Sequence, residues 1–157
     1  MAMNNHRVKV GDVFQILTSE GICYGQVTHK HPKWKFLVSI FRNFPEQQPA
    51  DFSEYVSQKP QFVTPFLIQL SVSRGYFAIV GNVPVAEHNA KSVIFRGTNN
   101  PGCGAETIWW LNDENGEHRL DRPLTSEELK YPRQALISAP LLLQYIQDDY
   151  RVERDYI

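Results

Sequence analysis

Apolar and polar residues alternate along much of this chain, which is the pattern of β-strands that turn one face toward a core. Near the N-terminus two such runs, "DVFQIL" and "ICYGQV", are separated by Thr18-Ser19-Glu20-Gly21, whose residue types are typical of turns. This stretch predicts a β-hairpin. Both faces of the first run are largely apolar, so we expect that strand to be covered on both sides. Gly25 lacks a side chain in mid-strand, where we expect a bend, a bulge or a close contact.

Further apolar runs, each bounded by turn-forming residues, predict additional strands. These runs are Trp34–Phe41, Phe66–Ser73, Gly75–Val85 and Lys91–Gly97. The alternation is most regular in Phe66–Ser73, so we expect its even-numbered residues to face inward. Residues 107–120 predict a second hairpin, whose turn contains the pair Asn115-Gly116 that tolerates positive φ.

The segment Asn43–Pro60 breaks both the strand and the helix periodicity, because Pro, Gln, Asp and Glu recur along it. We interpret it as a long surface connection with room for one helical turn.

After Leu124 the pattern changes to that of helices. Thr125 and Glu128 have the spacing of a capping box, which predicts a short helix that ends near Pro132. A second helix is predicted from Ser138-Ala139-Pro140 onward, with apolar residues at helical spacing. Strands first and helices last indicate an α+β fold. We predict a mainly antiparallel, strongly twisted, barrel-like sheet with short C-terminal helices.

Composition and charge narrow the classes of protein that the chain fits. With 157 residues, of which 42% are hydrophobic and 21% charged, the chain is predicted to form one domain over residues 1–157. The formal net charge of −1 lacks the strong positive field of a generic nucleic-acid binder. Neither a secretory signal nor an apolar stretch that spans a bilayer is visible, so we expect a cytoplasmic protein that does not bind membranes.

The residues offer little for catalysis or cofactor binding. Cys23 and Cys103 lie outside any metal-ligand spacing, so we predict no disulfide, no metal site and no cofactor. Phosphate-binding, dinucleotide-binding and hydrolase motifs are missing from the sequence. Cys103, in "GCG", would need His88 or His118 as a base to act as a nucleophile. A cysteine in a flexible glycine loop is the favoured interpretation, and we predict that the protein is not an enzyme.

Two clusters of aromatic and charged residues remain as candidate binding sites. The segment His29–Lys35 is basic and contains Trp34, which suits either a nucleic-acid contact or a solvated loop, and the near-neutral net charge favours the loop. Trp109 and Trp110 must point to opposite sides of a strand, so one indole is expected at the surface beside acidic residues. That indole would suit a basic partner. The slightly favoured interpretation, however, is that the second tryptophan covers the edge of the sheet or packs under a helix.

Several stretches together resemble a known family. These are "VKVGDVFQI" followed by "YGQV", "TPFLIQLSV" leading into "YFAIVGNVPVAE", and the hairpin pattern W-x-L-N-D-x-N-G-E. In this combination the chain resembles the immunity protein 26 family of bacterial polymorphic toxin systems. One departure is Phe77, where we expect a tryptophan that Tyr76 replaces only in part.

The resemblance implies a small cytoplasmic protein that binds a cognate toxin domain and blocks it without catalysis. The first hairpin would then be scaffold, and a basic cleft of a nuclease toxin would call for acidic side chains. We predict that the contact residues are acidic or aromatic and lie in the long connection and the second hairpin. They are Glu46, Asp51, Glu54, Trp109, Asp113 and Glu114. The alternative function is a small nucleic-acid-binding β-barrel that uses the segment His29–Lys35.

Overall fold

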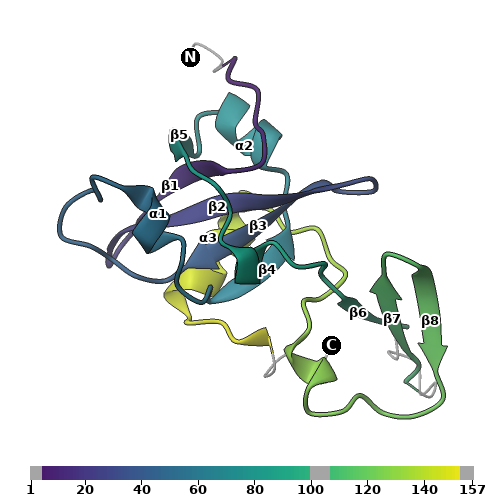
Figure 1. The fold of residues 1–157 in the computed structure, drawn as a ribbon. Coiled ribbons are helices and arrows are strands. Elements are labelled where there is room, and N and C mark those ends of the chain that lie inside the picture. The colour runs from purple at the N-terminus through teal and green to yellow at the C-terminus, as the bar shows by residue number, and fades with distance from the viewer. Residues whose placement is uncertain (1–4, 100–106, 153–157) are drawn as a thin grey trace. The chain divides into compact units, whose positions relative to one another are not determined.

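The computed structural model describes residues 5–99 and 107–152 of the chain (Figure 1). The described residues form two compact units, one of residues 5–91 with 136–150 and one of residues 92–99 with 107–135 and 151–152. The first unit contains a five-stranded sheet and the second a three-stranded sheet. That residues 1–157 form a single domain stays a prediction.

The first unit is built on an antiparallel sheet with strand order β4-β3-β2-β1-β5. Its strands are β1 (Asp12–Thr18), β2 (Gly21–His31), β3 (Lys35–Phe41), β4 (Phe62–Pro65) and β5 (Ala78–Asn82). Its helices are α1 (Phe52–Tyr55), α2 (Ile68–Ser73) and α3 (Ala139–Gln147), with a 3-10 turn at Glu87–Asn89. Among the described residues this sheet is not closed into a barrel, because β4 and β5 are its edges. The predicted α+β class with a mainly antiparallel sheet is confirmed.

The predicted N-terminal hairpin is present as β1 and β2. Thr18 pairs with Gly21, whose φ of 136° is a conformation that glycine adopts without strain. The close contact expected at Gly25 is also confirmed, since a Cβ atom there would overlap the ring of Phe14. The expected cover on both sides of β1 fails at Leu17, whose side chain is 62% exposed.

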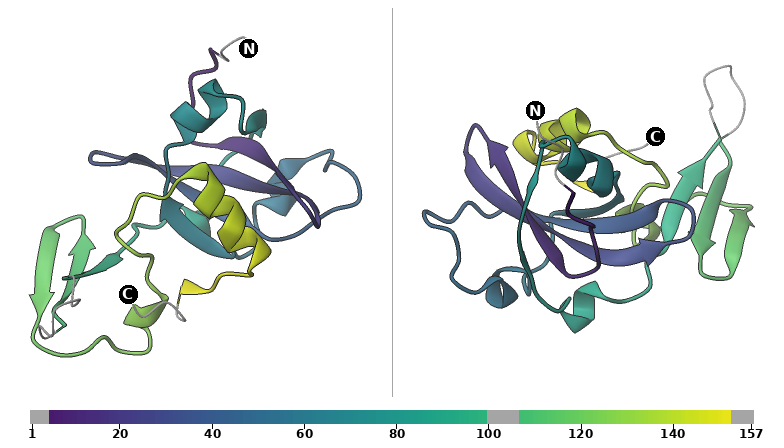
Figure 2. Two further views of the ribbon diagram at one scale, coloured as in Figure 1. Left: turned by 180° about the vertical axis from the view of Figure 1, so that it is seen from behind. Right: turned by 90° about the horizontal axis from the view of Figure 1, so that it is seen from above.

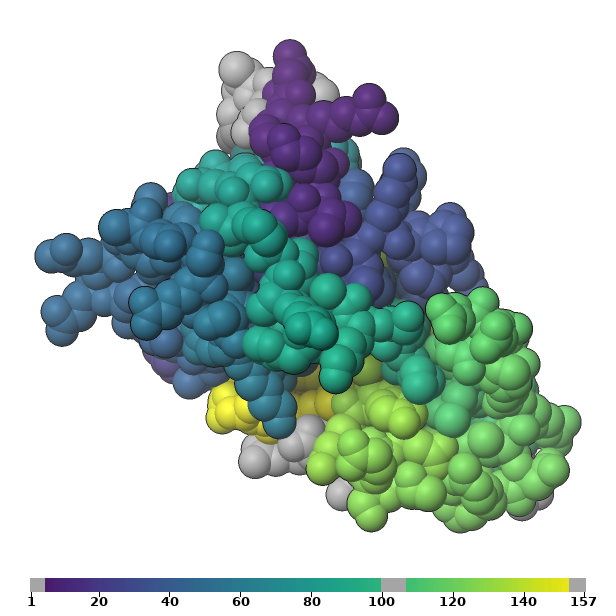
Figure 3. All heavy atoms as spheres, viewed as in Figure 1, coloured from purple at the N-terminus to yellow at the C-terminus, as the bar shows by residue number. Residues whose placement is uncertain are grey.

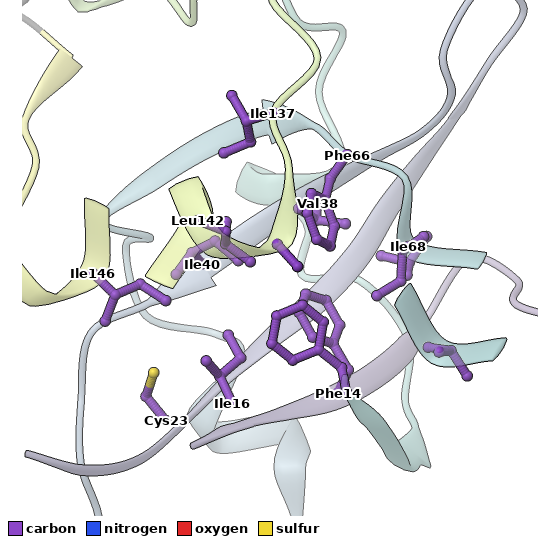
Figure 4. Packing of buried hydrophobic residues seen from close by; sticks show 14 of the residues in the cluster. Phe14, Ile16, Cys23, Val38, Ile40, Phe66, Ile68, Ile137, Leu142 and Ile146 are labelled. Carbon is purple, nitrogen blue, oxygen red and sulfur yellow. The ribbon is translucent and has the colours of Figure 1, made fainter. Parts of the chain in front are cut away.

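One face of the sheet packs against α3 (Figure 2). Phe14 and Ile16 of β1 lie in one buried cluster with Leu142 and Ile146 of α3 (Figure 4). The helix begins as predicted, because Oγ of Ser138 accepts a hydrogen bond from the backbone N–H of Leu141 at 3.3 Å. The apolar spacing of its sequence therefore does bury one helix face on the sheet.

The opposite face of the sheet packs against α1. The single helical turn expected in Asn43–Pro60 is confirmed, but its role was missed, since Phe52 and Tyr55 are buried with Val13 and Tyr24. The sheet thus has a second buried apolar cluster, which was not predictable because the connection that supplies part of it is mostly polar.

The strand predicted at Phe66–Ser73 is wrong. The chain forms β4 before it and then the helix α2, which buries Ile68 and Val72. Pro65 is the last residue of β4, because proline cannot donate a backbone hydrogen bond to a neighbouring strand. Ile68 and Val72 are four residues apart, so they lie on one face of a helix, although the same apolar pattern also fits the alternation of a strand. Leu70, expected inside, is 44% exposed.

The second unit contains β6 (Phe95–Thr98), β7 (Trp109–Asp113) and β8 (Gly116–Leu120), all paired antiparallel. The predicted hairpin is β7 with β8. The predicted capping box is also present: the backbone N–H of Thr125 donates to Glu128 at 3.0 Å, and that of Glu128 donates to Oγ1 of Thr125 at 3.2 Å. The helix that it was expected to open is only a 3-10 turn, Glu128–Lys130.

Candidate functional site

In the first unit, the acidic residues of the predicted site lie on one exposed segment. Glu46, Asp51 and Glu54 are all exposed, and residues 43–58, named here the acidic connection, contain no Lys, Arg or His. Figure 3 shows this segment projecting from the surface, in blue at the left. Oδ1 of Asp51 accepts a hydrogen bond from the backbone N–H of Ser53 at 2.9 Å, which lowers the pKa of Asp51. The segment therefore presents three carboxylates, and the nearest bases along the chain are Arg42 before it and the exposed Lys59 after it.

The acidic connection is fixed to the sheet by buried hydrogen bonds. The hydroxyl of Tyr55 accepts from the backbone N–H of Tyr24 at 3.2 Å, and its single proton is shared between the carbonyl oxygens of Phe41 at 3.0 Å and Asn43 at 2.7 Å. Nδ2 of Asn89 donates to the carbonyl of Val56 at 3.0 Å. This surface is consequently preformed.

In the second unit, the remaining predicted residues lie on the hairpin of β7 and β8. Oδ1 of Asp113 accepts from the backbone N–H of Asn115 at 2.8 Å and contacts Nε2 of His118 at 3.2 Å. These bonds lower the pKa of Asp113, the first of them most. Glu114, in the turn, is exposed, and both Trp109 and the adjacent Trp110 are half-buried. The structure thus groups the six predicted residues into two sets, three in each unit.

A groove in the second unit was missed by sequence analysis. It has a volume of about 630 Å³, and the residues that line it include both indoles, Gly97, Glu117 and Gln134. Nε2 of Gln134 donates to Oε1 of Glu117 at 3.2 Å. Gln134 reaches this position because the backbone of residues 132–134 pairs with β6. The backbone N–H of Arg96 donates to the carbonyl of Pro132, and the backbone N–H of Gln134 donates to the carbonyl of Arg96. Nothing in the local sequence signals that pairing.

The basic segment His29–Lys35 forms the end of the hairpin of β2 and β3. Nδ1 of His31 accepts from the backbone N–H of Lys33 at 3.1 Å and of Trp34 at 3.2 Å, and the His31 ring stacks on the indole at 4.4 Å. Burial, and secondly the charge of Lys33, lower the pKa of His31. Nε2 of His29 lies 2.8 Å from the carbonyl oxygen of Lys91. Both histidines therefore make structural contacts.

The described residues offer no catalytic centre that we recognise. Burial raises the pKa of Cys23 to about 12, so this thiol is a poor nucleophile. Cys103 lies outside the described residues. No group of three or more His, Cys, Asp or Glu that would suit a metal ion occurs within residues 5–99 and 107–152. In the same part of the chain, none of the helices has the length and apolar character needed to cross a membrane.

Comparison with known proteins gives one finding. Neither the curated proteins nor the solved structures include a match to this chain. The family model described as Immunity protein 26 matches residues 9–105, which is more than half of the chain. The matched range contains the acidic connection and ends before Trp109. The chain therefore belongs to the immunity protein 26 family, whose members give immunity against toxins.

Proposed function

We propose that this protein binds a cognate toxin domain in the bacterial cytoplasm and neutralises it by covering part of its surface. The toxin would belong to a polymorphic toxin system, delivered to neighbouring cells by contact-dependent inhibition. Family membership supports a toxin as the partner. The observation that carries the proposal is the acidic connection, because its exposed carboxylates stand on a segment held by a buried core, and a surface ordered in advance loses little entropy when it binds.

The proposed contacts are the acidic and aromatic residues of the two sets. They are Glu46, Asp51, Glu54, Trp109, Asp113 and Glu114. Carboxylates attract a basic toxin surface and speed its capture, while a tryptophan supplies apolar contact area. Inhibition by coverage needs roughly 800 Å² on each partner and no reactive group. The proposal therefore includes no catalysis, no cofactor, and neither nucleic acid nor membrane as a partner.

The test is co-expression with the product of the gene beside that of this protein, in which the proposal predicts a C-terminal toxin domain. Wild-type protein should restore growth and co-purify with the toxin domain. Single alanine variants at the six positions should weaken protection, whereas Glu87→Ala and Glu127→Ala, two exposed carboxylates outside the set, should not. No protection by the wild type would refute the function, and full protection by all six variants would place the contacts elsewhere.

A gel-shift titration tests the alternative function. Three exposed lysines, Lys30, Lys33 and Lys35, surround Trp34 at the end of the hairpin, which is the observation that favours nucleic acid. The proposed function predicts no salt-sensitive shift of mixed RNA or DNA at micromolar protein. A shift that charge reversal of these lysines abolishes would support the alternative instead.

A further inference from the structure

The end of the first hairpin exposes a pair of apolar side chains. Leu17 of β1 and Ile22 of β2 face each other in the strand register, and their side chains are 62% and 37% exposed. Their neighbours on the same strands, Ile16 and Cys23, are fully buried. Single exposed apolar residues are ordinary, but an adjacent pair forms a continuous apolar contact area.

This pair lies on the sheet face that α1 covers. Side chains alternate along a strand, so Leu17 shares its face with Val13, and Ile22 shares its face with Tyr24. Val13 and Tyr24 belong to the buried cluster of α1. Ile22 is therefore the next residue after Tyr24 on this face of β2, while Gln15 separates Leu17 from Val13 on β1.

Negative charge on this face comes from the acidic connection. Its helix α1 packs on the same face as the pair, and Asp51, which caps α1, and Glu54, which lies within it, are both exposed. The ion pair of Arg42 with Glu20 belongs to the opposite face, where Arg42 also donates to the carbonyl of Ile146 in α3. Carboxylates beside an exposed apolar pair favour a partner with positive charge around an apolar contact.

We infer that Leu17 and Ile22 form the apolar centre of the toxin-binding surface of the first unit, with the acidic connection as its charged rim. The occupant is a toxin surface on which an apolar side chain is bordered by Lys or Arg. An apolar centre within a polar rim is the usual anatomy of a protein interface. This inference rests on the proposed function and adds the hairpin, otherwise scaffold, to the contact surface.

A second exposed apolar group gives a matched control. Leu70 of α2 is 44% exposed, and the next exposed charge along the chain is that of Arg74. A toxin surface bordered by Lys or Arg would be repelled there. Substitution of Leu70 should therefore leave binding unchanged.

The experiment measures binding of the full-length protein to the toxin domain of the neighbouring gene, by biolayer interferometry. The test variant is Leu17→Thr with Ile22→Thr, because threonine removes apolar area but keeps the β-branched shape that strands favour. The control variant is Leu70→Gln, which keeps a good helix former. We expect the double variant to bind about tenfold more weakly or worse, and the control to match the wild type.

Three outcomes separate this inference from the function on which it depends. If wild-type protein does not bind the toxin domain, the proposed function fails. If wild-type protein and the double variant bind equally, the function stands and the inference is overturned. A double variant with a lowered melting temperature is replaced by Leu17→Thr alone, whose exposed position makes it neutral for folding, and equal binding by that variant also overturns the inference.

Discussion

The ring of Phe14 occupies the space above Gly25, so this position of β2 accepts no side chain larger than hydrogen. Phe14 is itself fully buried and contacts Phe77 with ring centroids 5.7 Å apart. A ring held in this way has little room to move aside. A methyl group at position 25 would therefore overlap it, and the close-packed residues around the ring would have to shift as well.

Gly25→Ala is therefore expected to lower the free energy of unfolding by about 1–3 kcal/mol, through overpacking. Urea denaturation measures the change. Phe14→Leu, introduced into the Gly25→Ala background, should recover part of the loss, because it removes the atoms that meet the new methyl group. Strict additivity of the two substitutions would show that the ring is not the cause.

Glu128 is another residue whose surroundings fix its chemistry. Its carboxylate accepts from Arg122 at 2.6 Å and from the backbone N–H of Thr125, and these bonds lower its pKa from 4.5 to about 2. A lowered pKa in the folded state means that the charged carboxylate stabilises the fold. This stabilisation is complete above about pH 4.5 and is lost as the pH falls toward 2.

Wild-type protein should consequently lose stability between pH 4.5 and pH 2 more steeply than Glu128→Gln. The glutamine keeps an acceptor for Thr125 but has no charge to lose. Thermal unfolding across this pH range, followed by circular dichroism, gives the comparison. Identical pH profiles for both proteins would contradict the assigned role of the Arg122 pair.

At the scale of elements, Tyr55 shows how one hydroxyl secures a whole segment. It joins α1 to the backbone of both β2 and β3, through bonds to Tyr24, Phe41 and Asn43. The acidic connection therefore depends on a buried group at its base for its position on the sheet.

Tyr55→Phe removes this hydroxyl, so the buried backbone N–H of Tyr24 loses the oxygen that accepts its hydrogen bond. The free energy of unfolding should fall by about 1–3 kcal/mol. Hydrogen exchange of the Tyr24 amide should also accelerate. Tyr76→Phe, at an exposed tyrosine, serves as the control and should change neither quantity. Unchanged exchange in Tyr55→Phe would mean that the hydroxyl does not hold the connection.

The elements that were predictable from the sequence are those whose signals are local. Both hairpins follow from alternation with turn residues between, and α3 follows from its cap at Ser138 and its spaced apolar residues. The helix α2 was not predictable because six residues with apolar side chains at alternate positions fit both periods. The burial of Phe52 depends on strands distant in sequence, which no local pattern reports.

At the scale of the whole molecule, the sequence shows no composition shift at residues 91 and 92, where the chain passes from the first unit to the second. The division into two units was therefore not predictable from composition.

The six proposed contacts were chosen for charge and aromatic character, and their part in binding stays a prediction. Leu17 was missed because alternation assigns it to a face that was expected to be covered, whereas it is 62% exposed in the structure.

Charge neutralisation tests the acidic connection without disturbing its fold. Glu46→Gln, Asp51→Asn and Glu54→Gln are combined in one variant, and asparagine at position 51 still caps α1. Association with the toxin domain should slow by about tenfold at low salt, with a smaller change in dissociation. Stopped-flow mixing at two ionic strengths measures both rates. An association rate equal to that of the wild type would exclude steering by this segment.

The helix α3 follows the second unit in the chain but packs into the core of the first. If the protein is expressed as two polypeptides, residues 1–91 and 92–157, Leu142 and Ile146 of the second piece complete the core of the first. The pieces should therefore find each other and restore protection of the cell, as a split-protein reporter does. Proteolytic cleavage between residues 91 and 92 would then leave the two pieces of the protein assembled.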